Sequence, residues 1–249
     1  MSENANATNV LRPLSTRSAL LSLLLSAEEP ALSARELIAG GRLIGFSEPT
    51  IRVALSRMVT AGDMTRTDDG GYRLSERLQH RQQRQEEAIH VRTRDWSGEW
   101  DMVVVTASGR SAADRAGLRA ELAELRLAEL REGVWLRPAN LELTWPGHLD
   151  SVCERLTTRP ARDPAELAAH LWDLPAWADR ARALLAATDT TDPALRFTAC
   201  ATSVRHLLED PALPEELLPA DWPGAELRKA HIEYNRWLIE TRRALTATA

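Results

Sequence analysis

The chain has 249 residues, of which 44% are hydrophobic and 27% are charged. This length allows a sizeable buried core and predicts one large domain or two to three small ones. The charges are balanced in sign and mixed with apolar positions, which excludes a disordered chain. No apolar run approaches the roughly 18–20 residues that a membrane span needs, so we expect no membrane partner.

The N-terminal residues 1–9 are polar and lack the basic and apolar stretches of a secretory signal peptide. We therefore predict a frayed tail and a cytoplasmic protein. The cysteines, Cys153 and Cys200, have no CxxC spacing and no suitably spaced histidine beside them. Buried thiols in a reducing compartment are expected, rather than a disulfide or a zinc site.

Basic residues are distributed unevenly along the chain. Residues 12–94 contain 13 arginines against 10 acidic residues, whereas residues 96–249 contain 18 basic against 24 acidic residues. A mildly basic N-terminal part followed by an acidic remainder fits a nucleic-acid-binding module at the N-terminus better than a wholly basic coating protein.

Two helices are predicted near the N-terminus. The first follows Ser15 and carries an apolar stripe over residues 20–25. The second begins at residues 33–36 (SARE), which have the pattern of a capping box, and is expected to end near Gly40–Gly41 or at Gly45.

A third helix start is indicated by residues 47–50 (SEPT), which combine a cap, an acidic first turn and an early proline. The predicted apolar face of this helix consists of Ile51, Ala54, Leu55, Met58 and Val59. Residues 64–67 and 72–74 flank a glycine-rich turn and predict a β-hairpin. Three helices followed by a hairpin are typical of a winged helix-turn-helix domain, here predicted over residues 13–76.

The outward face of the third helix has the chemistry that a DNA major groove requires. It offers arginines for guanine, hydroxyls for phosphates or bases, and a small apolar contact for a thymine methyl group. The predicted DNA-binding residues of this helix are Thr50, Arg52, Val53, Ser56, Arg57 and Thr60. Arg66 and Arg73 flank the turn of the predicted wing, where they would reach a phosphate or the minor groove. The alternative is that these arginines only keep an ordinary helix soluble.

Residues 77–95 are polar and rich in arginine, with Arg77, Arg81 and Arg84 at helical spacing. We predict a solvated helix that connects two domains. Contact with the DNA backbone is the alternative.

A change of character follows at Trp96. The patterns predict a buried strand at residues 100–105, a helix at 110–125, strands at 133–138 and 140–145, and a possible fourth strand at 152–157. This order is that of a ferredoxin-like α/β domain over residues 96–160, shortened because little room for a second helix remains between Trp145 and Val152.

The remainder, residues 161–249, is predicted to be a helical domain. Proline-containing loops separate four helices, at residues 164–171, 175–187, 193–209 and 224–246. The fold class predicted for the whole chain is therefore α+β.

Motifs of common enzyme chemistry are missing from the sequence. It has no phosphate-binding glycine loop, no nucleophile elbow, no HExxH and no calcium loop. The six histidines have no metal-ligand spacing, and acidic pairs such as Glu86–Glu87 are typical of solvated faces. We predict no catalytic residue, no metal and no cofactor.

Several segments resemble the PaaX family of transcriptional repressors. Residues 51–59 (IRVALSRMV), 61–64 (AGDM) and 72–74 (YRL) resemble its N-terminal domain. The resemblance continues in residues 96–100 (WSGEW), 133–138 (GVWLRP) and 210–224 (DPALPEELLPADWPG). It implies a winged-helix DNA-binding domain, a central ferredoxin-like domain similar to a small CRISPR-associated nuclease, and a helical C-terminal domain.

The resemblance also implies a homodimeric repressor of aromatic catabolism. The best-known member acts on phenylacetate genes and is released by the aryl-CoA thioester. Residues 105–108 (VTAS), where the first central strand ends, lack the carboxylate that a metal-dependent nuclease would need there, so nuclease activity is not expected.

The sequence therefore favours a ligand-responsive repressor of a catabolic operon. It would bind a (pseudo)palindromic DNA operator as a homodimer and be released by a small effector such as an aryl- or acyl-CoA thioester. One alternative is an acyl-CoA-handling enzyme or nuclease with an appended winged helix. Another is a winged helix that serves protein–protein contact.

Overall fold

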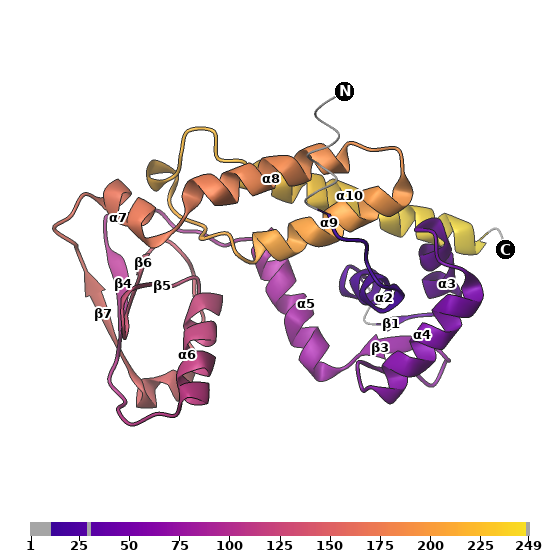
Figure 1. Cartoon of the computed structure of the whole chain (residues 1–249), viewed down its shortest axis with the longest axis horizontal. Helices are drawn as coiled ribbons and strands as arrows, with labels where there is room; N and C mark the ends of the chain where they lie inside the picture. Colours follow the sequence, from indigo (N-terminus) through magenta and orange to yellow (C-terminus); the bar gives the residue numbers. More distant parts are fainter. Residues whose placement is uncertain (1–10, 29–30, 248–249) are drawn as a thin grey trace. The chain divides into compact units, whose positions relative to one another are not determined.

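The computed structural model describes residues 11–28 and 31–247 (Figure 1). The described residues form helices and two small antiparallel sheets, and they divide into two compact units. The first unit comprises the described residues of Met1–Ile89, Asp179–Leu207 and Pro223–Ala249, and the second comprises His90–Ala178 and Leu208–Trp222. The predicted N-terminal tail lies outside the described residues.

The first unit begins with helices whose starts were predicted. They are α2 (Thr16–Leu25), α3 (Ala34–Leu43) and α4 (Glu48–Thr60). Each is preceded by a serine, at positions 15, 33 and 47, whose hydroxyl accepts a hydrogen bond from a backbone N–H three residues further on. The capping box formed by Ser33 and Glu36 is confirmed.

Helix α3 does not end at Gly40–Gly41, so that alternative is wrong. A Cβ atom at Gly41 would lie 2.5 Å from Cδ1 of Ile51, and one at Gly40 would lie 3.1 Å from Cδ1 of Leu23. These glycines therefore allow close packing of α3 against its neighbours α4 and α2. The helix ends just before Gly45, whose φ of +93° favours glycine.

The predicted hairpin is present as β2 (Met64–Arg66) and β3 (Tyr72–Leu74). A short strand, β1 (Ala31–Leu32), pairs with the other edge of β3 and gives the antiparallel order β1-β3-β2. Two residues are too few for a sequence pattern, so β1 was not predicted.

Helix α5 (Glu76–Ile89) occupies the segment predicted as a solvated connector, and that description is wrong for one of its faces. Its buried residues are Leu78, Gln85, Ala88 and Ile89. The amide nitrogen Nε2 of Gln82 donates to the carbonyl oxygens of Leu25 and Ala27, each at 3.1 Å. The burial of this face could not be predicted from the polar composition, because glutamine side chains make part of the contacts.

Helices α9 (Pro193–Leu207) and α10 (Gly224–Ala247) also belong to the first unit. Phe197, Cys200, Tyr234 and Leu238 belong to the same buried cluster as the apolar residues of α2, α3 and α4. Segments at the two ends of the chain thus share one hydrophobic core.

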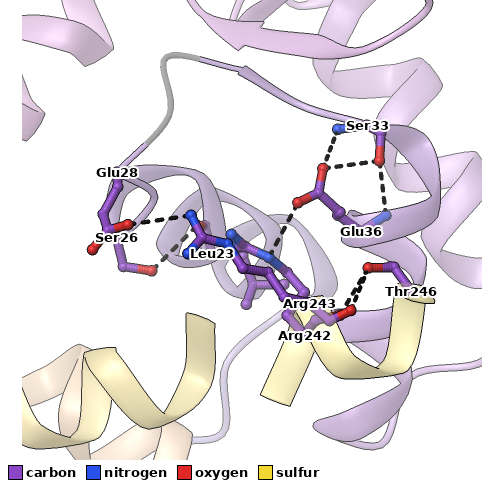
Figure 2. A network of polar contacts seen from close by, with 8 residues as sticks. All are labelled: Leu23, Ser26, Glu28, Ser33, Glu36, Arg242, Arg243 and Thr246. Carbon is purple, nitrogen blue, oxygen red and sulfur yellow. Dashed lines mark hydrogen bonds and ion pairs between the residues drawn. The ribbon is translucent and has the colours of Figure 1, made fainter. Parts of the chain in front are cut away.

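The end of α10 is also tied to the N-terminal helices by polar contacts (Figure 2). Arg242 is 2% exposed, and its Nε lies 3.7 Å from Oε1 of Glu36 in α3. Arg243 Nη2 lies 3.3 Å from Oε2 of Glu28, and the Thr246 hydroxyl donates back to the carbonyl oxygens of both arginines. The guanidinium of Arg242 is therefore buried at a junction between α10 and α3.

The second unit is built on a four-stranded antiparallel sheet. Its strands are β4 (Trp100–Val105), β5 (Ala128–Arg131), β6 (Val134–Pro138) and β7 (Cys153–Thr158), in the order β5-β6-β4-β7. Helix α6 (Ala112–Glu124) connects β4 to β5, and a single 3₁₀ turn, η1 (Gly147–Ser151), lies between β6 and β7.

Two predictions for this sheet need correction. Residues 140–145 do not form a strand, and only an isolated bridge joins Leu141 to Thr93. The chain leaves the sheet because the side chain of Asn140 turns into the interior, where it is 1% exposed. Strand β5 was missed because its sequence, AELR, has no β-branched residue and contains an irregularity between Glu129 and Arg131.

A second core covers one face of this sheet. Helices α7 (Pro164–Leu171) and α8 (Leu174–Thr188) and the 3₁₀ turn η2 (Glu215–Leu217) follow the sheet in sequence. Trp100 and Leu136 pack with apolar residues of these elements, namely Leu167, Ala168, Leu174 and Leu217, and with Leu213, which precedes η2.

Arg137 is fully buried in the second unit. Its Nη2 donates to Oδ1 of Asn140 at 2.9 Å, and its Nε donates to the carbonyl oxygen of Pro138 at 3.0 Å. Asn140 Nδ2 in turn donates to the carbonyl oxygen of Ala212 at 3.0 Å. Burial lowers the pKa of Arg137 to about 9. This value is still above neutral pH, so the guanidinium remains charged.

Candidate nucleic-acid interface

Helix α4 has one buried and one exposed face. Ile51, Leu55 and Met58 are at most 1% exposed and fix the helix on the core of the first unit. All predicted residues of the opposite face are exposed, namely Thr50, Arg52, Val53, Ser56, Arg57 and Thr60. The structure therefore brings the six together on one accessible surface.

Val53 is an apolar side chain that the fold leaves in solvent, with 52% of its surface exposed. It borders a hollow of about 630 Å³ that lies between the start of α2 and the outer face of α4. The residues that line the hollow are Ser15, Thr16, Arg17, Pro49, Thr50, Val53, Ala54, Arg57, Met58 and Ala61. The start of α2 was not among the residues predicted to bind, although its serine cap was visible in the sequence.

The two arginines of α4 differ in their surroundings. Arg52 donates from Nε and Nη2 to Oε1 of Glu48, at 2.9 and 2.7 Å. A surface pair of this kind is worth only about 0.3–0.5 kcal/mol, so another partner can replace it. Arg57 has no hydrogen bond or ion pair from its guanidinium within the part of the chain that the structure describes. It is available to an external ligand without breaking any contact.

The hydroxyl groups of α4 are partly occupied by local contacts. The oxygens of Ser47 and Thr50 lie 2.8 Å apart at the helix start. Thr60 donates to the carbonyl oxygen of Ser56 at 3.1 Å, so its hydroxyl can only accept a further bond.

The hairpin places its two arginines on opposite faces. Arg66 pairs with Tyr72 across the strands, and its Cζ lies 5.5 Å from the centre of the Tyr72 ring. Arg73 pairs with Thr65, and because side chains alternate along a strand it points to the other face. Both side chains remain exposed.

The turn between β2 and β3 is acidic. Asp68 and Asp69 are exposed there, and the hydrogen bond from the Thr67 hydroxyl lowers the pKa of Asp69. Because these carboxylates repel a phosphate, its approach to the hairpin is more favourable at the faces where Arg66 and Arg73 lie.

A buried carboxylate joins the elements around α4. The side chain of Asp63, which follows α4, is 3% exposed and lies 2.7 Å from Nη2 of Arg17 and 3.3 Å from Nη2 of Arg77. The start of α2, the end of α4 and the start of α5 are thus held together at one point. Asp63 and Arg17 were not predicted to matter, because their partners are 46 positions apart in the sequence.

Within residues 11–28 and 31–247, no helix is long and apolar enough to cross a membrane. The same residues contain no group of three or more His, Cys, Asp and Glu side chains that could hold a metal ion. Cys153 and Cys200 are both buried as free thiols, as predicted.

Three family models match the chain in order. They are described as PaaX-like protein, matching residues 15–78, PaaX protein central Cas2-like domain, matching residues 93–152, and PaaX-like protein C-terminal domain, matching residues 165–246. No curated protein matches it. A solved structure, the uncharacterized protein Rv0674 from Mycobacterium tuberculosis, is 47% identical over 93% of this chain and 98% of its own, with a TM-score of 0.80.

Proposed function

The chain belongs to the PaaX-like family, whose members are generally transcriptional regulators, and from this premise we propose that it is a DNA-binding repressor. The resemblance that the sequence predicted is thereby confirmed. The observation that carries the proposal is the outer face of α4. There Arg57, which is unpaired within the described residues, and the exposed Val53 lie one helical turn apart.

The arrangement around α4 supports a winged helix-turn-helix domain. Helices α2, α3 and α4 are followed by the hairpin β2–β3, and the third helix of such a domain lies in the major groove. Nothing in the first unit's core requires Val53, Ser56 or Arg57 to be these residue types, because all three side chains are exposed.

Each residue of the interface is proposed to make a contact that suits its chemistry. Arg57 would bind guanine with two hydrogen bonds, and Val53 would contact a thymine methyl group. Arg52 would exchange Glu48 for a base or phosphate. The hydroxyl groups of Thr50, Ser56 and Thr60 would form hydrogen bonds with bases or phosphates. Arg66 and Arg73 would bind a phosphate or the minor groove.

The rest of the proposal follows from one recognition helix per chain. A homodimer would present two copies of α4 to successive major grooves, and so a (pseudo)palindromic operator is expected. An effector, with an aryl- or acyl-CoA thioester as the first class to test, would release the repressor by binding better to a conformation that does not fit DNA. Such a repressor acts in the cytoplasm and is not an enzyme.

The second unit supports a ferredoxin-like domain. Counted along the chain, its strands have the spatial order second-third-first-fourth, with α6 between the first two. This order supports a split β-α-β fold in which the second helix is reduced to the turn η1.

The proposal is tested by measuring binding to DNA from upstream of the gene. Fluorescence anisotropy with a labelled promoter fragment should give saturable binding that weakens steeply with salt, and an unrelated fragment of equal length should bind at least about a thousandfold more weakly. Binding that is absent at about 50 mM salt, with a folded protein, would point instead to a winged helix used for protein contact.

A further inference from the structure

A small cavity lies inside the first unit, away from α4. Helices α2, α5, α9 and α10 enclose it, and its volume is about 40 Å³. Its buried wall includes Leu25, Phe197 and Leu238, which are at most 5% exposed. At its other end are the exposed Arg205 and Glu86. The cavity therefore runs from a charged mouth to an apolar interior.

In the buried wall, the hydroxyl oxygen of Tyr234, a side chain that is 4% exposed, and Oδ1 of Asn235 have no hydrogen-bond partner among the described residues. His231 also lines this wall and has an interaction of its own. Asn235 uses its Nδ2 to donate to the carbonyl oxygen of Ser26 at 3.2 Å, which fixes the amide so that Oδ1 can only accept. Leaving a buried donor or acceptor unpaired is unfavourable, so a group that fits both atoms is favoured here.

The mouth of the cavity carries an excess of positive charge. Arg81 and Arg205 both line it, and neither guanidinium forms a hydrogen bond or ion pair with any residue in the described part of the chain. Burial, followed by repulsion from Arg205, lowers the pKa of Arg81. Among the described residues of the lining, Glu86 is the one acidic side chain, and it already has a partner of its own. The charge at the mouth therefore favours an anion.

Two side chains in the interior of the cavity, Cys200 and Tyr234, are neutral. Burial raises the pKa of the Cys200 thiol to about 12 and raises the pKa of Tyr234 as well, so both groups keep their protons at neutral pH. A charge on the ligand thus has partners at the mouth, whereas the interior suits an uncharged hydroxyl and a short carbon chain.

We propose that this cavity binds a short-chain hydroxycarboxylate. The carboxylate would lie between Arg81 and Arg205, where the arginines can donate hydrogen bonds to its two oxygens. The hydroxyl of the ligand would accept from Tyr234 and donate to Asn235 Oδ1, which pairs both orphan atoms at once. The carbon chain would contact Leu25, Phe197 and Leu238.

The volume limits the ligand to a short one. About 40 Å³ holds roughly three water molecules, since one water occupies on the order of 10–15 Å³ on this measure. A benzene ring fills a cavity of roughly 150 Å³. The interior therefore accepts a hydroxyl and two or three carbons, while the carboxylate stays at the mouth, and it excludes an aromatic ring.

The position of the cavity would allow a bound ligand to influence the proposed recognition helix α4. Helix α2 lines it through Ser22, Leu25 and Ser26 and also packs against α4. A bound molecule would thus tie α9 and α10 to a helix that supports the proposed recognition helix. That the site is an effector site rests on the proposed function, whereas binding of the hydroxycarboxylate does not.

Calorimetric titration of the full chain tests the site. Sodium lactate and sodium 3-hydroxybutyrate are the probes, with sodium butyrate, which lacks the hydroxyl, and 1,3-butanediol, which lacks the carboxylate, as controls at constant ionic strength. We expect saturable binding of at least one hydroxycarboxylate at millimolar concentration. Butyrate should bind about tenfold more weakly, because one hydrogen-bonded pair is missing, and the diol should not bind detectably.

Two variants test the assigned contacts. Tyr234→Phe keeps the ring and should lower the affinity for the hydroxycarboxylate about tenfold while leaving the affinity for butyrate unchanged. Arg81→Gln should weaken both ligands about tenfold or more, whereas Arg84→Gln, which removes the same charge from α5 outside the cavity lining, should change neither.

If neither hydroxycarboxylate binds saturably up to about 50 mM, the cavity holds only water and the proposal is overturned. Equal affinities for butyrate and 3-hydroxybutyrate would overturn it too. Promoter binding by the same preparation is measured in parallel. Intact promoter binding without hydroxycarboxylate binding rejects this inference alone, and the reverse result rejects the DNA-binding function alone.

Discussion

Arg17 and Asp63 form a two-pronged ion pair, in which Nη2 and Nε of the arginine lie 2.7 and 2.8 Å from the two carboxylate oxygens. The arginine lies in the first turn of α2 and the aspartate follows α4, so the pair fixes the two helices that border the proposed DNA-binding hollow. Asp63 also holds the backbone in place, since its N–H donates to Met58 and its carbonyl oxygen accepts from Ser75, at 3.0 and 2.9 Å.

Replacing Asp63 by alanine is expected to destabilise the first unit by about 2 kcal/mol, because hydrogen bonds to a charged group are worth about 1.5–3 kcal/mol. Urea unfolding followed by circular dichroism measures the change. The control is Arg77→Ala, which removes only the longer and more exposed contact at 3.3 Å and should cost less than about 1 kcal/mol. Equal effects of the two variants would mean that the Arg17 contact contributes nothing.

Gly41→Ala should destabilise the protein by about 1–3 kcal/mol, because the added Cβ would lie 2.5 Å from Cδ1 of Ile51. Ile51→Val removes that atom, and the double variant should therefore lose less stability than the sum of the two single variants. Thermal unfolding of the four proteins gives the coupling.

The matched control for this substitution is Gly117→Ala in α6, where an added Cβ meets nothing within 4 Å. It should leave the stability unchanged or raise it by about 0.4–1 kcal/mol. A Gly41→Ala protein as stable as the Gly117→Ala protein would contradict the close packing of α3 on α4.

Features that depend on residues close together in the sequence could be predicted, whereas contacts between helices could not. A helix start depends on residues three positions apart, so the three starts at Ser15, Ser33 and Ser47 were predicted correctly. Of the two predicted ends of α3, the one at Gly40–Gly41 is wrong, because the side chain that requires a glycine at position 41, Ile51, belongs to another helix.

The same distinction between local and long-range features applies to the candidate interface. Exposure of Arg57 and Val53 follows from the 3.6-residue period of α4 and was predicted. Three features depend on contacts between distant segments and could not be predicted. They are the contribution of Arg17 to the hollow, the burial of one face of α5, and the cavity beside Tyr234.

Arg57→Ala is expected to weaken binding to the promoter fragment by about 1–3 kcal/mol and to relax the preference at one base pair. The unfolding midpoint should not change, because the side chain is exposed and unpaired within the described residues. Arg52→Ala should have a smaller effect, since Glu48 competes for that guanidinium.

Arg236→Ala, which removes an exposed charge from α10, serves as the control for both α4 variants and should leave DNA affinity unchanged. Anisotropy with the promoter and with single-base variants of it measures the effects. A loss of affinity accompanied by a large drop in the unfolding midpoint would assign Arg57 a structural role instead.

In the hairpin, Arg66→Ala and Arg73→Ala should weaken binding nearly equally for all DNA sequences. Each lost phosphate contact should flatten the slope of log K against log salt by roughly one unit. Asp68→Asn combined with Asp69→Asn should act in the opposite direction, because these exposed carboxylates repel the DNA backbone. A salt slope that is the same in the wild type and in the Arg66/Arg73 double variant would exclude the hairpin from the interface.

Arg137→Met is expected to destabilise the second unit by about 2–4 kcal/mol, because a buried acceptor left without a donor costs about 1–3 kcal/mol. Methionine fills much of the same volume but leaves Oδ1 of Asn140 and the carbonyl oxygen of Pro138 without the donors that they have at 2.9 and 3.0 Å. Because Asn140 in turn holds the carbonyl oxygen of Ala212, the loss should also free the segment at residues 210–214. Hydrogen exchange should therefore quicken there, while the amides of α4 in the other unit keep their protection. Arg131→Met, at an exposed position of the neighbouring strand β5, should change the stability by no more than about 0.5 kcal/mol. If both variants unfold at the same urea concentration, the buried guanidinium does not hold this segment to the sheet.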